Sequence, residues 1–158
     1  MQTTTTQRHR TRFPATIDGV VAAATWLHGV TETEQLSAKL AFAIEVCLEE
    51  LFTNVMNHGG PGTATTNDDE LPLFVELALD LGDDDVSLFV EDNGRPFDVS
   101  QAPARPIRRP LEEVMPGGLG MQLIRSFSSE LLYEPLPGGN RVIVKFLRGE
   151  QPETKAED

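Results

Sequence analysis

The sequence predicts an α+β fold, a two-layer α/β sandwich in which helices cover one face of a mostly antiparallel sheet. Three observations lead to this fold class. Apolar residues recur at helical spacing over residues 36–55. They alternate with other residues over residues 73–81 and 86–91, as in strands that are buried on one face. Near the C-terminal end, glycines separate two further short apolar runs, as in a hairpin.

Length and cysteine usage indicate one domain that needs no covalent reinforcement. The chain has 158 residues, and we expect the folded domain over residues 8–148, between polar tails at residues 1–7 and 149–158. A chain of this length can bury a sufficient core without a disulfide or a metal. Its single cysteine, Cys47, lies in a helical pattern and is expected to be buried.

The charge of the chain is strongly negative. The net charge is −12, from 25 acidic and 13 basic residues. Such a surface repels phosphate backbones and anionic lipids, so we expect no direct nucleic-acid binding and no membrane binding. The segment Met1–Arg12 is polar, and no run approaches the roughly 20 apolar residues of a membrane span. We therefore expect a cytoplasmic protein.

The first elements are expected to be a strand and two helices. Residues 8–13 predict a short edge strand, and Thr16 can cap a helix that extends to about residue 30. Thr31 and Glu34 have the spacing of a capping box, which predicts that the long second helix begins there. The apolar period continues to about residue 58, where Gly59 and Gly60 end it.

The remaining elements alternate between sheet and loop. Residues 60–71 predict a loop, and a turn at residues 82–85 joins the two alternating stretches into a hairpin. The proline-rich connection over residues 93–116 is long for a compact domain, which is typical of a functional lid. A helix follows Gly117 and Gly118. The last hairpin is predicted from residues 131–136 and 141–147, with Gly138, Gly139 and Asn140 at its turn.

Polar residues on the long predicted helix recur at a spacing of four. Glu50, Asn54 and His58 share one helical face, with Asn57 beside them. The row borders the apolar stripe, where a partly desolvated carboxylate can act as a base. An asparagine oxygen is a hard ligand suited to Mg²⁺. The alternative is a solvated helix edge, on which His58 interacts with the negative end of the helix dipole.

Two further motifs follow along the chain. The segment Asp92–Asp98, DNGRPFD, comes directly after a strand, and it reads either as an ordinary turn or as a site where the Asp92 carboxylate accepts a hydrogen bond from an exocyclic amine. The glycines of Gly117–Gly120, GGLG, precede a helix, so their backbone can approach a phosphate at the positive end of the helix dipole. Each motif alone is a weak signal.

Taken in order, the three motifs resemble the N, G1 and G2 boxes of the GHKL ATPases. The Pro-Phe-Asp of residues 96–98 and the closing Gly-Gly-Asn-Arg of residues 138–141 resemble the anti-sigma-factor serine/threonine kinase branch. The resemblance covers roughly residues 10–147, nearly the whole folded part. It implies a Bergerat (GHKL) ATP-binding fold, with a mixed, mostly antiparallel sheet and helices on one face.

The resemblance also implies site residues for ATP and Mg²⁺. Glu50 would be the general base that activates an acceptor hydroxyl, and Asn54 would bind the Mg²⁺ that bridges the phosphates. Asp92 would bind the adenine amino group, with Gly94 leaving room for the base. The candidate nucleotide-binding residues are, in full, Asn54, Asn57, Asp92, Gly94, Phe97, Arg105, Gly117, Gly118, Leu119 and Gly120.

Two positions depart from the family pattern. Some kinases of this branch carry an arginine just before the second glycine box, where this chain has Pro116. Its basic residues lie further upstream, at Arg105, Arg108 and Arg109, where they serve either the phosphates or a solvated loop. Many GHKL proteins also place a threonine that helps to hold adenine in the last glycine turn, where this chain has Asn140 and Arg141.

The function that the resemblance implies is serine/threonine protein kinase activity in a partner-switching regulatory system. Such a kinase binds a sigma factor and phosphorylates a serine on a STAS-domain anti-anti-sigma factor, usually as a homodimer. One alternative is a nucleotide-gated partner-binding module with little or no turnover, which Pro116 favours. Another is the ATPase half of a histidine kinase, but the stretch before the first helix leaves no space for a dimerising hairpin.

Overall fold

The sheet is the central layer of the protein. The computed structural model describes residues 7–60, 72–101 and 120–149. In this part, five strands form one sheet in the order β1-β2-β3-β5-β4, and every pairing is antiparallel. The strands are β1 (Gln7–Pro14), β2 (Phe74–Leu81), β3 (Asp85–Asp92), β4 (Glu130–Leu136) and β5 (Gly139–Leu147). The predicted α+β fold with a mostly antiparallel sheet is thereby confirmed.

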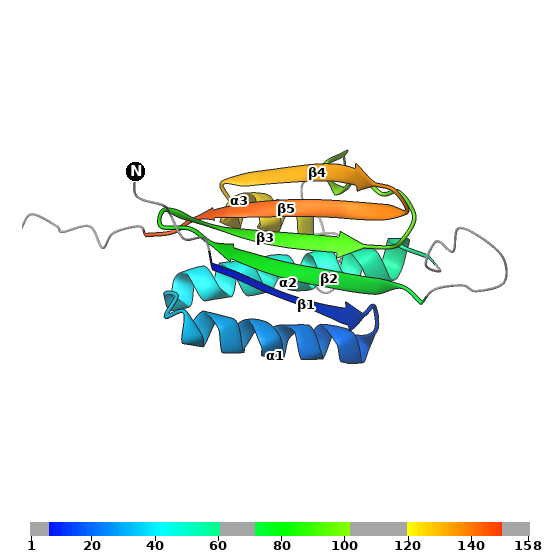
Figure 1. Cartoon of the computed structure of the whole chain (residues 1–158). Helices are drawn as coiled ribbons and strands as arrows, with labels where there is room; N and C mark the ends of the chain where they lie inside the picture. The colour runs from blue at the N-terminus through cyan, green and yellow to red at the C-terminus, as the bar shows by residue number, and fades with distance from the viewer. Residues whose placement is uncertain (1–6, 61–71, 102–119, 150–158) are drawn as a thin grey trace, which may run out of the picture.

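The helices of the described part pack on one face of this sheet (Figure 1). They are α1 (Ile17–Thr33), α2 (Ala38–His58) and α3 (Gly120–Phe127), and a short 3-10 turn, η1 (Val99–Gln101), follows the third strand. Helix α1 packs on β1 and on α2, whereas α2 lies across β3 and β5 and also contacts α3. Because α2 touches both the sheet and the other two helices, it fixes the position of the polar residues on its C-terminal half.

Strand alternation places one set of side chains in the core and the other on the open face. Val86, Leu88 and Val90 of β3 are buried against the helices. Helix α2 contributes Ile44 and Cys47, neither of which is exposed. Burial raises the pKa of the Cys47 thiol to about 12, with a smaller contribution from the charge of Glu50, so this cysteine is a core residue as predicted.

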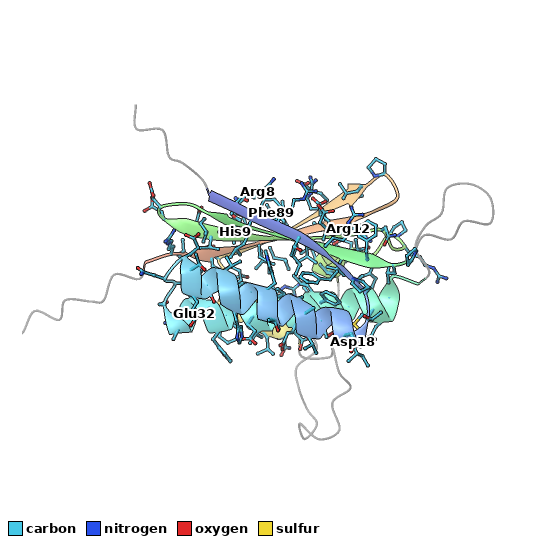
Figure 2. All side chains as sticks on the ribbon, turned by 60° about the horizontal axis from the view of Figure 1, so that its bottom comes forward. Arg8, His9, Arg12, Asp18, Glu32 and Phe89 are labelled. Carbon is cyan, nitrogen blue, oxygen red and sulfur yellow. The ribbon has the colours of Figure 1, made fainter. Side chains whose placement is uncertain are left out.

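The open face of the sheet is covered by paired charges. Figure 2 shows Arg8, Arg12 and Phe89 on the strand side of the molecule, away from α1. Arg8 Nε lies 2.6 Å from Asp80 Oδ1, and its guanidinium stacks over the Phe89 ring at 5.1 Å from the centroid. Each exposed ion pair adds little stability, on the order of 0–1 kcal/mol. The charges here are matched within the chain, so this face does not concentrate charge of one sign.

The junction between α1 and α2 differs from the prediction. The capping box that the sequence predicts at Thr31 and Glu34 is wrong, because both residues belong to the end of α1. The Thr31 hydroxyl donates to the carbonyl of His28 within α1, at 3.1 Å. Gln35 then turns the chain with a φ of 54°, and Ser37 caps α2 by accepting from the Leu40 N–H at 3.2 Å.

The last hairpin also turns earlier than the sequence predicts. Strand β4 ends at Leu136 and β5 begins at Gly139, so Gly139 and Asn140 are strand residues and not turn residues. Gly138 supplies the left-handed conformation of the tight turn, with a φ of 81°. The consequence for the site is large, because Asn140 pairs with Asp92 across the sheet.

Several expectations fall on residues that the structure does not describe. Residues 61–71 of the loop predicted over residues 60–71, most of the predicted lid, and the glycines at positions 117 and 118 lie outside the described residues. Within the described ranges, no helix combines the length and the apolar character that crossing a membrane requires.

Candidate functional site

A cavity lies where the C-terminal half of α2 meets the end of β3. Its lining comes from α2, β3, β5 and the segment after β3, and comprises Leu51, Asn54, Val55, His58, Gly59, Val90, Asp92, Arg95, Phe97, Val99, Asn140 and Val142. The open space is small, about 20 Å³, which is room for a water molecule or two. Binding of a nucleotide base therefore requires side chains at this cavity to move apart.

Asp92 is a buried carboxylate at the end of β3, and among the described residues only one of its two oxygens has hydrogen-bond partners. Asp92 Oδ1 accepts hydrogen bonds from the Gly94 N–H at 2.8 Å and from Asn140 Nδ2 at 3.0 Å. Burial raises the pKa of the Asp92 carboxyl, and these two hydrogen bonds oppose the rise. Within the described ranges Oδ2 has no hydrogen-bond partner, so it can accept a hydrogen bond from a ligand in the cavity.

The turn after β3 packs directly against the end of α2, and this contact requires glycine. A Cβ on Gly94 would lie 2.7 Å from the Cα of Gly59, and the Arg95 N–H donates to the Gly59 carbonyl at 2.9 Å. A Cβ on Gly59 would meet the Val55 carbonyl at 2.6 Å. Glycine at position 94 lets the turn meet the end of the helix closely, which brings Asp92 close to α2.

An aromatic stack closes one side of the cavity. His58, at the end of α2, stacks on Phe97 with the ring centroids 4.5 Å apart and an interplanar angle of 11°. His58 is exposed and Phe97 is partly buried, so the stack borders both the cavity and solvent. The sequence predicts only a dipole interaction for His58. The stack is an additional contact between segments that are distant in the sequence.

Asn54 and Asn57 differ in their surroundings although they lie one turn apart on α2. Asn54 is buried and lines the cavity, and its side-chain amide makes no hydrogen bond within the described part of the chain. Asn57 is exposed and does not line the cavity, so its role as a nucleotide ligand stays a prediction. An amide that is buried yet free to bond fits a ligand group or a hydrated cation.

Glu50 lies one turn before Asn54 and faces the start of α3. A Cβ on Gly120 would collide with Glu50 Oε2, so a larger residue there would displace the Glu50 carboxylate. Oε2 is buried and has no hydrogen-bond partner in the part of the chain that the structure describes. Burial raises the pKa of the Glu50 carboxyl, and the neighbouring charge of Glu49 adds to the rise. A carboxylate with these properties is suited to accept a proton.

The site has no preformed cage for a metal. Across residues 7–60, 72–101 and 120–149, no three His, Cys, Asp or Glu side chains cluster closely enough to hold a metal ion. A magnesium ion at Asn54 would therefore take most of its ligands from phosphates and water, as Mg²⁺ commonly does.

The structure brings some of the predicted site residues together and leaves others untested. Asn54, Asp92 and Phe97 line one cavity, and Gly94 supports it from the turn. Glu50 and Gly120 contact each other one helical turn away. The predicted residues Arg105, Gly117, Gly118 and Leu119 lie outside the described residues, as does Pro116, so their roles stay predictions.

Sequence reasoning placed Asn140 in the last glycine turn and did not foresee that its side chain holds this corner together. Asn140 is buried and bonds to Asp92, and Tyr133 donates to Asn140 from β4 at 2.6 Å. One signal was present in the sequence, because Asn140 stands where many GHKL proteins have a threonine that helps to hold adenine. The expected turn over residues 138–140 concealed it.

Comparisons with known proteins show the family of this chain. The family described as "Histidine kinase-like ATPase domain" matches residues 13–146. A serine/threonine-protein kinase, BtrW, from Bordetella bronchiseptica is 32% identical over 118 residues, which are 74% of this chain and 78% of the relative.

A solved structure has the same fold. The RsbU and RsbW domains of Rv1364c from Mycobacterium tuberculosis superpose with a TM-score of 0.60 at 16% identity. The match covers 90% of this chain and spans about a third of that longer chain, 32%. Because the family match extends over most of the sequence, from residue 13 to residue 146, the chain belongs to the histidine kinase-like ATPase domain family.

Proposed function

We propose that this chain binds ATP and acts as an anti-sigma-factor-type serine/threonine protein kinase in a partner-switching system. One observation carries the proposal: Asn54, Asp92 and Phe97, from separate segments, line a single cavity, with Glu50 and Gly120 in contact beside it. The similarity to the kinase BtrW supports the same activity.

The adenine ring is proposed to bind in the cavity between α2 and the end of β3. The unpaired Asp92 Oδ2 accepts the hydrogen bond from the 6-amino group, because Oδ1 is already occupied. The rings of His58 and Phe97 border the same space and offer aromatic contact to the base. Since the open space is small, about 20 Å³, these rings have to separate when the base enters.

The phosphates are proposed to extend from the cavity toward the start of α3. In the described part of the chain α3 begins at Gly120, and the N–H groups and positive dipole end of a first helical turn favour an anion. Asn54 provides one oxygen ligand for Mg²⁺, which neutralises phosphate charge when it is bound. The glycines at 117 and 118 and a lid arginine such as Arg105 complete the proposed phosphate site.

Glu50 is the proposed general base. The acceptor serine hydroxyl gives its proton to Glu50 Oε2 as its oxygen bonds to the γ-phosphorus. The bond from that phosphorus to the β,γ-bridging oxygen breaks, and ADP leaves with the electron pair. The burial of Oε2 and its raised pKa support the role, because a base is most effective when its pKa approaches the working pH.

The proposed acceptor is a serine on a STAS-domain anti-anti-sigma factor, and the proposed regulatory partner is a sigma factor. The proposal includes a cytoplasmic location and a homodimer, both as the family resemblance implies. Support comes from the relative named as a serine/threonine-protein kinase and from the fold shared with a structure that contains an RsbW domain.

The proposal is tested by incubating the purified chain with γ-labelled ATP, Mg²⁺ and a STAS-domain protein encoded by the same genome. We expect label on a serine of the STAS protein, identified by mass spectrometry, and loss of that label with Glu50→Ala. Label that appears at the same rate with Glu50→Ala would remove the proposed base.

A second candidate function is a nucleotide-gated binding module with little or no turnover. It is favoured by Pro116, because the arginine found there in some kinases of this branch is missing. This function predicts capture of the partner in the presence of ATP and Mg²⁺ without phosphoserine. It also predicts that Glu50→Ala leaves capture unchanged.

A further inference from the structure

Asn140 has every hydrogen-bonding position of its side chain occupied. It is only 3% exposed, at the start of β5. Its Nδ2 group donates to Asp92 Oδ1 at 3.0 Å and to the Arg95 carbonyl at 2.7 Å. Its Oδ1 accepts from the Phe97 N–H at 2.9 Å and from the Tyr133 hydroxyl at 2.6 Å. A side-chain amide can donate twice and accept twice, so none of its capacity remains.

These bonds connect three parts of the molecule at one point. Asp92 ends β3, Tyr133 belongs to β4, and Arg95 and Phe97 lie in the segment that follows β3. The amide therefore fixes the carboxylate of Asp92 and the backbone on which the Phe97 ring is mounted. Because all four hydrogen-bonding positions of the Asn140 amide are occupied, it cannot also form a hydrogen bond with a ligand.

The orientation of the Asp92 carboxylate follows from these contacts. The Gly94 N–H and Asn140 Nδ2 both bond to Oδ1, which leaves Oδ2 as the oxygen that can meet a ligand. Gly139 lets the start of β5 approach the end of β3 closely, since a Cβ there would collide with the Asp92 backbone carbonyl. Without Asn140, Gly94 alone would hold the carboxylate, and rotation about its Cβ–Cγ bond would exchange the two oxygens.

We propose that Asn140 is a positioning residue for base recognition, which orients Asp92 so that Oδ2 faces the 6-amino group of adenine. The inference rests on the proposed function, because it concerns how the ATP site reads the base. It assigns selectivity for a 6-amino purine to a residue that does not itself touch the base.

The test is a thermodynamic cycle between residue 140 and the amino group of the ligand. Calorimetry measures the affinity of the full chain, and of Asn140→Ala, for ATP and for purine riboside triphosphate, which lacks the 6-amino group. The unmodified chain should prefer ATP by about tenfold or more, the value of one well-placed hydrogen bond. In Asn140→Ala this preference should fall toward one.

Asn93 provides a matched control. It is also buried, at 8% exposure, and its amide also joins backbone segments, through the Phe74 N–H at 2.8 Å and the Pro72 carbonyl at 3.0 Å. Neither of these bonds goes to Asp92. Asn93→Ala should lower the melting temperature as Asn140→Ala does, but it should leave the preference for ATP unchanged.

An isosteric variant gives a second measurement that does not require Asn140→Ala to fold. In Asn140→Asp the donor group becomes an oxygen, which repels the Asp92 carboxylate unless one of the two carboxyls is protonated. We expect weak ATP binding at about pH 8 that recovers by about pH 6, as protonation restores a donor. His58, Tyr133, Arg95 and Asp98 also face this corner, so the unmodified chain at each pH serves as the reference.

The outcomes separate this inference from the proposed function. If the unmodified chain does not bind ATP, both fail. If it binds ATP with the expected preference, but Asn140→Ala keeps that preference, only the positioning role of Asn140 is overturned. Binding by Asn140→Asp that matches the unmodified chain at every pH would overturn it as well.

Discussion

Two carboxylates, the buried Asp92 and the partly buried Glu50, show how differently the two ends of the site are built. Both have a raised pKa because burial penalises their charge. Asp92 Oδ1 is held by two hydrogen bonds, from Gly94 and Asn140, whereas the buried Oε2 of Glu50 has none within the described ranges. The carboxylate at the proposed base-binding end is therefore already oriented in the described structure, whereas the carboxylate at the proposed chemical end is not.

This difference in hydrogen bonding matches the different roles proposed for the two carboxylates, binding of the base for Asp92 and proton transfer for Glu50. A carboxylate fixed by neighbours binds a ligand without the cost of ordering its side chain first. A buried oxygen without a partner is unfavourable by itself, so it persists where a substrate hydrogen completes it. Substitutions at the two carboxylates should therefore affect different measurements, and this can be tested from the largest effect to the smallest.

The largest expected effect is on phosphoryl transfer, at Glu50. Glu50→Gln keeps the shape of the side chain but removes the base, so single-turnover transfer to the STAS partner should fall by about 10²–10⁴-fold. ATP affinity should stay within about twofold, because Glu50 is not proposed to bind the base. Glu49→Gln, at the exposed neighbouring position, is the control and should retain transfer. If Glu50→Gln lowered the ATP affinity as much as the transfer rate, the proposed difference in role between Glu50 and Asp92 would be contradicted.

The second effect is on affinity, at Asp92. Asp92→Ala removes the acceptor for the 6-amino group and leaves the Asn140 amide with an unpaired donor, so ATP affinity should fall by about 10–100-fold. Displacement of a fluorescent ATP analogue measures this loss. Asp80→Ala removes a carboxylate from the ion pair with Arg8 on the open face, and it should bind ATP normally. A comparable loss in both variants would point to a general effect on the fold.

The third effect is the pH dependence of transfer. A base works only when it is deprotonated, so the rate should rise with pH through the pKa of Glu50. Because burial and the charge of Glu49 raise that pKa, the midpoint should lie above the value of about 4.3 for an ordinary glutamate. Glu49→Gln should move the midpoint down. A transfer rate that stays constant as the pH rises from about 4.3 to neutral would contradict the role of Glu50 as a base.

The smallest effect is on the stability of the free chain. The pKa of Asp92 is higher in the folded state than in the unfolded state, where it is about 3.9. Ionisation of Asp92 therefore lowers the free energy of unfolding as the pH rises from about 3.9 through the pKa of the folded state. Asp92→Asn removes this cost. Its free energy of unfolding relative to the unmodified chain should therefore rise on going from acidic to neutral pH, by on the order of 1 kcal/mol. Urea unfolding at both pH values measures this change, and a relative stability that falls with pH would be inconsistent with the raised pKa.

Much of the architecture could be predicted from local patterns. The apolar period that ends at Gly59 predicted the end of α2, and strand alternation predicted the hairpin of β2 and β3. Asp92 could be singled out because a carboxylate at the end of an apolar strand is unusual. These features depend on neighbours in sequence, which periodicity and turn chemistry describe directly.

The errors and omissions arise where distant segments decide the outcome. Thr31 fits a capping box by spacing, but its hydroxyl bonds back into α1 and Ser37 caps α2 instead. Asn140 was expected in a turn, yet a shorter turn moves it into β5 opposite Asp92. The stack of His58 on Phe97 joins α2 to the segment after β3, and no local pattern encodes such a pairing.

The central claim is that one cavity at the junction of α2 and β3 binds an adenine nucleotide. Isothermal titration calorimetry of the full chain with ATP, with and without Mg²⁺, tests it most directly. We predict saturable binding at one site per chain, tighter with Mg²⁺ and clearly weaker for GTP, which lacks the 6-amino group. The absence of saturable binding at millimolar ATP by a chain that is folded by circular dichroism would contradict the claim.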